Sequence, residues 1–176
     1  MGVILWLVNL VYFMLPAYGA NMAPVVSRYF GASMPLDFGM KVGGIRLLGA
    51  HKTVLGTVFG IVTALVIAFV QKVVFMETGF GLVDYSQWIR IGLLLGGGAL
   101  IGDAVKSCVK RRMHIPAGTP WVPFDQLDFV IGALIFVSLI YFPGWGESIA
   151  IIVMSVLGHV LVNHSVFFLG VRQEKW

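Results

Sequence analysis

Five long apolar stretches dominate the chain and predict membrane-spanning helices. Each is close to the length that crosses about 30 Å of hydrocarbon when a helix rises about 1.5 Å per residue. The fourth stretch is the shortest and needs tilt or local thinning of the bilayer to cross. We therefore expect an all-α integral membrane protein that forms a single domain over residues 1–176, with spans near residues 3–20, 54–75, 88–105, 127–142 and 149–170.

The first stretch shares one feature with secretory signal peptides, because Ala17 and Gly19 supply small residues of the cleavage type. No Lys or Arg precedes Arg28, so the positive region that begins a signal peptide is missing. We interpret this stretch as a retained helix. We expect it to bend near Pro16, where the missing amide hydrogen interrupts the helical ladder.

Charge is scarce and unevenly distributed. The chain is 59% hydrophobic and 11% charged, whereas a soluble domain carries about 25% charge. Ten of the twelve basic residues lie in residues 21–53, in residues 106–126 or after the last stretch, and only Lys72 and Arg90 fall on the other side. The positive-inside rule then predicts an outside N-terminus, a cytoplasmic C-terminus and two long cytoplasmic connections. With so many basic groups, the cytoplasmic face would attract polyanions.

A polar stripe follows the third stretch. Asp103, Lys106, Ser107 and Lys110 recur at i, i+3, i+4 and i+7, so a continued helix presents them on one face, with Arg111 beside them. The plainer interpretation is a basic anchor at a span end, with Asp103 neutralised by a lysine. An ionisable group this close to the hydrocarbon is costly, which favours a functional role for Asp103.

A pair of carboxylates opens the fourth stretch. Asp125 and Asp128 stand at i and i+3 on one helix face, and together with Asp103 they would offer oxygen ligands to Mg²⁺ while leaving positions for phosphate oxygens and water. Alternatively, they are only the acidic first turn that favours a helix N-terminus, with Asp125 as the N-cap. The nearby basic residues favour the metal-and-phosphate interpretation.

The first connection carries a weaker signal. Asn21 and Pro24 follow the first stretch, and Lys52 and Thr53 precede the second, where a helix start would hold a phosphate through ammonium, hydroxyl and amide groups. No Walker loop is present. The glycines of residues 31–44 argue against one continuous helix in this connection. Glycines also recur at four-residue spacing, which is a packing signal and is not specific for a dimer: Gly56 with Gly60, Gly92 with Gly96, and Gly98 with Gly102.

The run Gly102-Asp103-x-x-x-Ser107-x-x-Lys110-Arg111, followed by Asp125-x-x-Asp128, resembles the signature of the membrane-embedded CTP:phosphatidate cytidylyltransferases. The Asn21-x-x-Pro24 element and the Lys52-Thr53 pair are more similar to the archaeal branch, the CDP-archaeol synthases. The bacterial and eukaryotic enzymes carry further Lys-Asp and His-Gly-Gly elements and an arginine where this chain has Gln126. The resemblance covers most of the chain.

The resemblance implies transfer of CMP from CTP to unsaturated archaetidic acid, an isoprenoid glycerol ether phosphate lipid, with release of pyrophosphate. It implies Mg²⁺ as the cofactor and a site at the cytoplasmic face of the cell membrane, with no nucleic acid and no protein partner. The expected metal ligands are Asp103, Asp125 and Asp128. The expected phosphate and nucleotide contacts are Asn21, Lys52, Thr53, Lys106, Ser107, Lys110 and Arg111.

A second function class competes with this prediction. A small transporter or flippase of a phosphorylated lipid would also have several spans with polar groups inside the membrane. Such a protein needs polar residues along a path through the bilayer, whereas here they gather at one face. The enzyme is therefore the better interpretation.

Overall fold

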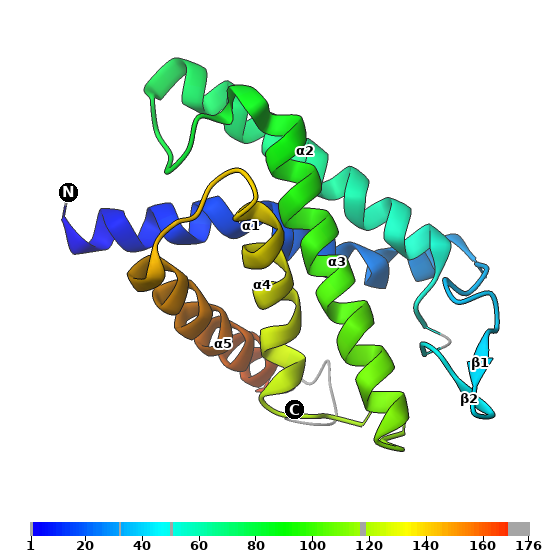
Figure 1. The fold of residues 1–176 in the computed structure, drawn as a ribbon. Coiled ribbons are helices and arrows are strands. Elements are labelled where there is room, and N and C mark those ends of the chain that lie inside the picture. The colour runs from blue at the N-terminus through cyan, green and yellow to red at the C-terminus, as the bar shows by residue number, and fades with distance from the viewer. Residues whose placement is uncertain (1, 32, 50, 117–118, 169–176) are drawn as a thin grey trace.

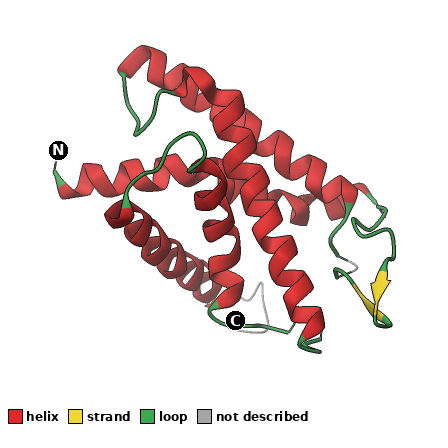
Figure 2. Ribbon diagram, in the orientation of Figure 1, coloured by secondary structure: helices red, strands yellow, loops and turns green. Residues whose placement is uncertain are grey.

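The computed structural model describes residues 2–31, 33–49, 51–116 and 119–168 and forms a helical bundle (Figure 1). Two short 3-10 helices, η1 (Arg28–Phe30) and η2 (Tyr85–Gln87), and a small antiparallel hairpin, β1 (Lys41–Val42) and β2 (Ile45–Arg46), lie between the long helices (Figure 2). The hairpin is a minor exception to the expected all-α fold. The long helices are α1 (Val3–Ser27), α2 (Val54–Thr78), α3 (Trp88–Arg112), α4 (Phe124–Val137) and α5 (Trp145–Phe168).

Capping residues set the ends of α2. The Thr53 hydroxyl accepts a hydrogen bond from the Gly56 amide at 3.1 Å. At the other end Gly79 adopts a left-handed conformation (φ 67°) and donates its amide hydrogen to the Phe75 carbonyl at 2.8 Å. Both devices satisfy backbone groups that a helix end leaves unpaired. The helix therefore begins where the second apolar stretch was predicted to begin.

The helix bounds correct several predicted limits. α1 continues through Pro16 and Pro24 to Ser27, and α3 continues to Arg112, because helical backbone hydrogen bonds do not require apolar side chains. The predicted span 127–142 was wrong at both ends. α4 starts directly after Pro123 and ends at Val137, where tight turn bonds replace the ladder. α5 starts at residue 145 rather than 149, and the predicted end at residue 170 lies outside the described residues.

In the described part of the chain, three helical segments are long and apolar enough to cross a membrane: Val3–Ser27, Val54–Thr78 and Tyr85–Arg112. The apolar run of α5, Trp145–Leu161, is shorter. α4 has 14 residues and is therefore about 21 Å long, less than the thickness of the hydrocarbon. The fold is that of a helical multi-pass membrane protein, and five crossings stay a prediction.

Glycines allow α3 and α4 to pack backbone against backbone. A Cβ atom on Gly98 would lie 2.6 Å from the Gly132 carbonyl oxygen, and one on Gly102 would lie 2.2 Å from the Asp128 carbonyl oxygen. Both distances are far below the roughly 3.5 Å of ordinary contact. Side chains larger than hydrogen would hold the helices apart. This seam of glycines fixes Asp125 and Asp128 of α4 beside the end of α3.

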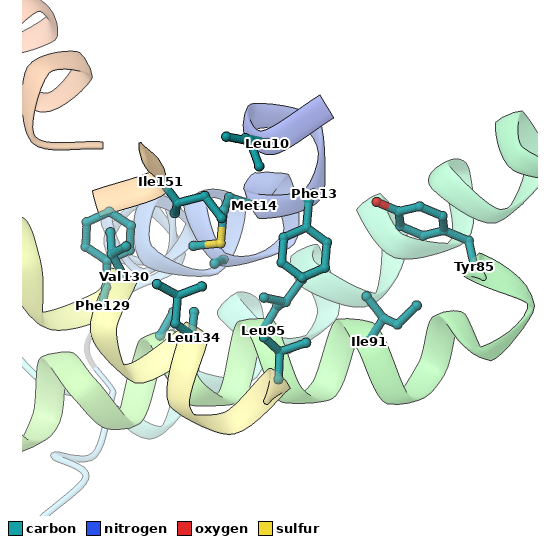
Figure 3. Packing of buried hydrophobic residues seen from close by; sticks show 14 residues of the cluster. Leu10, Phe13, Met14, Tyr85, Ile91, Leu95, Phe129, Val130, Leu134 and Ile151 are labelled. Carbon is teal, nitrogen blue, oxygen red and sulfur yellow. The ribbon is translucent and has the colours of Figure 1, made fainter. Parts of the chain in front are cut away.

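The buried apolar core lies where α1, α3, α4 and the start of α5 meet (Figure 3). Outside it, large apolar side chains such as Val62 and Ile135 remain more than half exposed. An apolar exterior of this kind is what a lipid-facing surface requires. The largest side chains of the core are Leu10, Phe13, Met14, Tyr85, Ile91, Leu95, Phe129, Val130, Leu134 and Ile151.

The described residues among 28–53 form a folded loop between α1 and α2, and the prediction that this connection is not one continuous helix is confirmed. The Leu36 amide donates to the Lys52 carbonyl at 2.7 Å, and the Val54 amide donates to the Met34 carbonyl at 2.9 Å. These bonds tie the middle of the loop to the segment that enters α2. Lys52 is thus held by backbone pairing.

Asp37 organises the interior of this loop. Its buried carboxylate accepts hydrogen bonds from the amides of Gly39 and Leu48, both at 3.0 Å, and from the Arg46 guanidinium at 2.7 Å. The bond from Arg46, supported by the two amides against the effect of burial, lowers the pKa of Asp37 to about 2. The loop is therefore a defined structure built around one ionised carboxylate.

Candidate active site

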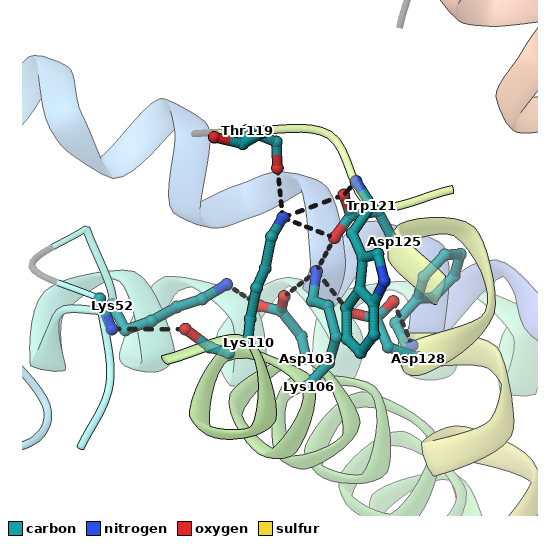
Figure 4. A network of polar contacts seen from close by, with 11 residues as sticks. Lys52, Asp103, Lys106, Lys110, Thr119, Trp121, Asp125 and Asp128 are labelled. Atoms are coloured by element: carbon teal, nitrogen blue, oxygen red, sulfur yellow. Dashed lines mark hydrogen bonds and ion pairs between the residues drawn. The ribbon is translucent and has the colours of Figure 1, made fainter. Parts of the chain in front are cut away.

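Three carboxylates surround one ammonium group where α3 meets α4 (Figure 4). The Nζ atom of Lys106 lies 3.4 Å from Oδ1 of Asp103, 2.8 Å from Oδ1 of Asp125 and 2.8 Å from Oδ2 of Asp128. The Asp128 side chain is only 5% exposed, so this contact is shielded from water. The structure thus brings together the stripe on α3 and the acidic pair on α4, which the sequence had suggested separately.

A second lysine reaches this cluster from the other side. Lys52, just before α2, forms an ion pair with Oδ2 of Asp103. Beside this pair is a cavity of about 210 Å³ whose walls come from α1, α2, α3 and the loop before α2 and include Asn21 and Thr53. The residues of the first connection, whose sequence pattern was only a weak indication, therefore lie next to the cluster around Asp103. Because Thr53 also caps α2, its hydroxyl already has one hydrogen-bond partner.

Lys110 and Asp125 also hold the connection between α3 and α4. Lys110 is buried, with its Nζ atom 3.3 Å from Oδ2 of Asp125 and hydrogen-bonded to the Thr119 carbonyl. Oδ2 of Asp125 accepts the Trp121 amide hydrogen at 2.6 Å. These contacts position the turn that leads into α4. Lys110 was predicted to contact phosphate, and the geometry gives it a positioning role as well.

Ser107 and Arg111 differ in their surroundings. The Ser107 hydroxyl, buried on α3, accepts a hydrogen bond from the Gly49 amide at 3.3 Å. This bond attaches the first loop to α3, and the expected contact of Ser107 with phosphate stays a prediction. Arg111 is half-buried, and its Nε atom is buried without a hydrogen-bond partner among the described residues. An anionic ligand would satisfy that group.

An apolar groove of about 450 Å³ runs between α3 and α4. Lys106 and Asp128 belong to its lining, so the groove reaches the charged cluster. Ile101 of α3 lines both spaces, but the other α3 residues divide, with 102, 105, 106 and 109 lining the groove and 100, 103 and 104 lining the polar cavity. At 3.6 residues per turn these two sets lie on opposite sides of α3. The cluster therefore stands between a polar cavity and an apolar groove.

The acidic residues suit a hard divalent cation in their chemistry, since Mg²⁺ prefers carboxylate oxygens. Within the described ranges, no three His, Cys, Asp or Glu side chains are placed close enough to hold a metal ion. The ammonium group of Lys106 lies between the carboxylates of Asp103, Asp125 and Asp128 instead. Their assignment as metal ligands stays a prediction, and it requires Lys106 to move aside.

Sequence reasoning missed three residues that shape the site. Asp37 orders the loop that carries Lys52, and Thr119 and Trp121 bind Lys110 and Asp125 through their backbones. One signal was available, because Asp37 is the only acidic residue in the basic segment 21–53. Backbone contacts such as those of Thr119 leave no mark on residue type, so pattern alone does not reveal them.

Comparisons with known proteins show which chains are similar to this one. Residues 3–176 match the model of the CarS-like family, described as CDP-archaeol synthase. Similar curated proteins include the CDP-archaeol synthases of Methanococcus aeolicus, 33% identical over 100% of both chains, and Methanopyrus kandleri, 36% identical over 94% of this chain and 91% of that protein. That of Methanospirillum hungatei is 37% identical over 93% of this chain and 100% of that protein.

A solved structure is also similar in fold. It is described as an intramembrane enzyme for archaeal membrane lipids biosynthesis. The two chains are 32% identical and superpose with a TM-score of 0.74, over 87% of this chain and 91% of the other. The arrangement of helices described above is therefore shared with a protein known from experiment.

Proposed function

Because this chain belongs to the CarS-like family of CDP-archaeol synthases, we propose that it transfers CMP from CTP to the phosphate of unsaturated archaetidic acid. The products are CDP-archaeol and pyrophosphate. The observation that carries the proposal is the cluster of Asp and Lys residues between a polar cavity and an apolar groove. A nucleotide from water and a lipid from the bilayer can meet at such a cluster.

In the proposed reaction an oxygen of the lipid phosphate attacks the α-phosphorus of CTP. A new P–O bond forms, the bond between the α-phosphorus and the bridging oxygen to the β-phosphate breaks, and pyrophosphate leaves with that electron pair. The second pKa of a phosphate monoester is about 6, so the nucleophile is already ionised at neutral pH. The reaction needs no general base. Its difficulty lies in bringing two polyanions together and stabilising the leaving group.

The charged residues divide this task. Lys52, Asn21 and Thr53 line the polar cavity. On this proposal Lys52 neutralises the triphosphate, and Asn21 and Thr53 hydrogen-bond the nucleotide. In the cluster, Lys106 lies where it can contact both reacting phosphates. Arg111 offers its unpaired buried Nε to an anionic oxygen. Ser107 and Lys110 keep the surrounding loops in place.

Mg²⁺ held by Asp103, Asp125 and Asp128 would neutralise charge on the phosphates and on the leaving group. Lys106, whose ammonium lies among the same three carboxylates, would pair with phosphate oxygens of the substrates. Each buried charge would then have a partner of opposite sign, which low-dielectric surroundings demand.

The apolar groove supports a lipid substrate with long chains. Its lining beyond Lys106 and Asp128 consists almost entirely of apolar side chains, among them Ile131 and Ile135 of α4. Isoprenoid chains lying in this groove would bring their phosphate to Lys106. We further propose that all five helices cross or enter the bilayer with the N-terminus outside, so that the site faces the cytoplasm, where CTP is available.

Pyrophosphate release tests the proposal directly. Purified protein in detergent or lipid receives CTP, Mg²⁺ and either archaetidic acid or phosphatidic acid. Release is expected to require CTP, the metal and the lipid phosphate. Asp128→Asn should abolish it, whereas Asp84→Asn, the same change at an exposed carboxylate that caps η2, should not.

The controls separate the possible failures. A near-ultraviolet circular dichroism spectrum identical to that of the wild type shows that Asp128→Asn is folded. Activity with phosphatidic acid alone would correct the lipid and retain the chemistry. Absence of release with both lipids in folded protein would overturn the proposal, and movement of a labelled lipid phosphate across vesicles would then identify a flippase.

A further inference from the structure

The loop between α1 and α2 exposes apolar side chains that its own fold does not bury. Each of them is more than half exposed, although the segment lies outside the three clear membrane spans. Two of them, Met34 and Phe38, line one surface pocket of this loop, and exposed apolar surface of this kind usually marks an interaction site. We refer to it as the loop patch, and its members are Tyr29, Phe30, Met34, Phe38, Met40 and Val42.

The loop patch belongs to an ordered structure. The Met40 amide donates to the Asp37 carbonyl at 2.7 Å, and the Leu47 amide donates to the Met40 carbonyl at 2.9 Å. Phe38 has a left-handed backbone (φ 48°), which is rare for a bulky residue and persists only when its surroundings impose it. The bonds to buried Asp37 impose it here. The loop thus holds Phe38 in an outward position.

The loop patch continues a lipid-facing surface. The rings of Phe30 and Phe59 are 5.1 Å apart, and Phe59 belongs to the first turns of α2. On the same helix, Val58 and Val62 are about half exposed along a clear candidate span. The apolar exterior of α2 therefore extends onto the loop without a polar break at Phe30.

The exposed charge of this segment is positive. Lys41 is exposed between patch residues Met40 and Val42, whereas the only acidic residue of the segment, Asp37, is buried. Apolar and aromatic side chains next to a lysine are the composition of segments that lie at the lipid headgroups. We propose that the loop patch is a membrane-docking surface that lies at the boundary of headgroups and acyl chains and binds an anionic lipid surface.

Docking would influence the site through the backbone. The loop that carries the patch also supplies Leu36 and Lys52 to the wall of the polar cavity. A patch fixed in the interface would hold this wall in a constant position relative to α3. The inference does not depend on the proposed reaction, because it concerns where the loop lies and not what the enzyme converts.

Collisional quenching tests the position of the loop patch. In a Cys108→Ser background the chain has no other cysteine, so Phe38→Cys or Val62→Cys carries a single polarity-sensitive dye. The labelled protein is placed in vesicles of phosphatidylcholine, with or without phosphatidylglycerol. We expect shallow spin-labelled lipids to quench the dye at position 38 strongly and aqueous iodide to quench it several-fold less than a free dye. Position 62 gives the reference for hydrocarbon.

Charge and apolar contact are then tested separately. Lys41→Glu should reduce the additional iodide protection that phosphatidylglycerol provides at position 38. Dye placed at Val42→Cys should become accessible to iodide when Phe38 and Met40 are both replaced by Asp, and should stay protected when both are replaced by Leu. Quenching by iodide at position 38 equal to that of a free dye would overturn the inference. Protection that depends on protein concentration would overturn it too, and would assign the patch to a second copy of the chain.

Discussion

Gly102→Ala should disable the site by separating α3 from α4. The new Cβ atom would lie 2.2 Å from the Asp128 carbonyl oxygen and 3.0 Å from the carbonyl carbon. Restoring ordinary contact near 3.5 Å requires a local separation of about 1.3 Å. The 2.8 Å contact between Lys106 and Asp128 would lengthen accordingly. Misplacing a catalytic group by about 1 Å costs about 100-fold in rate, and overpacking costs about 1–3 kcal/mol of stability.

Gly97→Ala is the matched control for this change. A Cβ atom on Gly97 meets its nearest neighbour, Cδ1 of Ile61, at 3.9 Å, which is ordinary contact. Both substitutions raise helix propensity equally, by about 1 kcal/mol, so the seam contact alone distinguishes them. The assay is the initial rate of pyrophosphate release, with thermal unfolding in detergent measured alongside. Equal rates for the two variants would refute the view that the glycine seam positions the site.

Two further predictions concern the loop and the groove. The Asp37–Arg46 pair should stabilise the loop fully above about pH 4 and lose this effect as the pH falls toward 2, because the pKa of Asp37 is about 2 when folded and about 3.9 when unfolded. An acid-active protease should therefore cut residues 28–53 faster across that range, whereas Asp37→Asn should be cut rapidly at every pH; a flat wild-type profile would contradict this. Ile131→Trp fills the groove and should raise the KM for a long-chain lipid phosphate while leaving the KM for CTP unchanged, and a short-chain lipid phosphate should be insensitive. Equal effects on both lipids would exclude the groove as the chain site.

Helical spacing made much of the site predictable. Asp103, Lys106 and Lys110 share a face of an α-helix because of their spacing, and the structure has them facing the Asp125–Asp128 pair. Gly98 and Gly102 were recognised as a packing signal, and they are the residues at which α4 approaches α3. Local periodicity was sufficient here because both motifs lie on regular helices.

Helix ends and loop contacts were less accessible to sequence reasoning. Hydropathy ends a span where polar residues begin, yet α3 continues to Arg112 because its ladder is satisfied without an apolar surface. α4 begins and ends earlier in the chain than the predicted span 127–142. Its start is set by Pro123 and by the hydrogen bond that the Trp121 amide donates to Asp125. The contact of Ser107 with the Gly49 amide spans 58 positions, and nothing local in the sequence indicates it.

The pattern of ion pairs also determines which substitutions can report on catalysis. Lys106 contacts three carboxylates, so replacing Asp128 by Asn leaves its ammonium paired with Asp103 and Asp125. Replacing Lys106 would instead leave the shielded Asp128 carboxylate without its ammonium partner, and removing one partner of a buried ion pair costs about 3–5 kcal/mol. A loss of activity in a lysine variant would therefore mix folding with chemistry. Asparagine at position 128 tests the chemistry by itself. It has the shape of aspartate, and Lys106 stays paired with two carboxylates, so the fold should be retained.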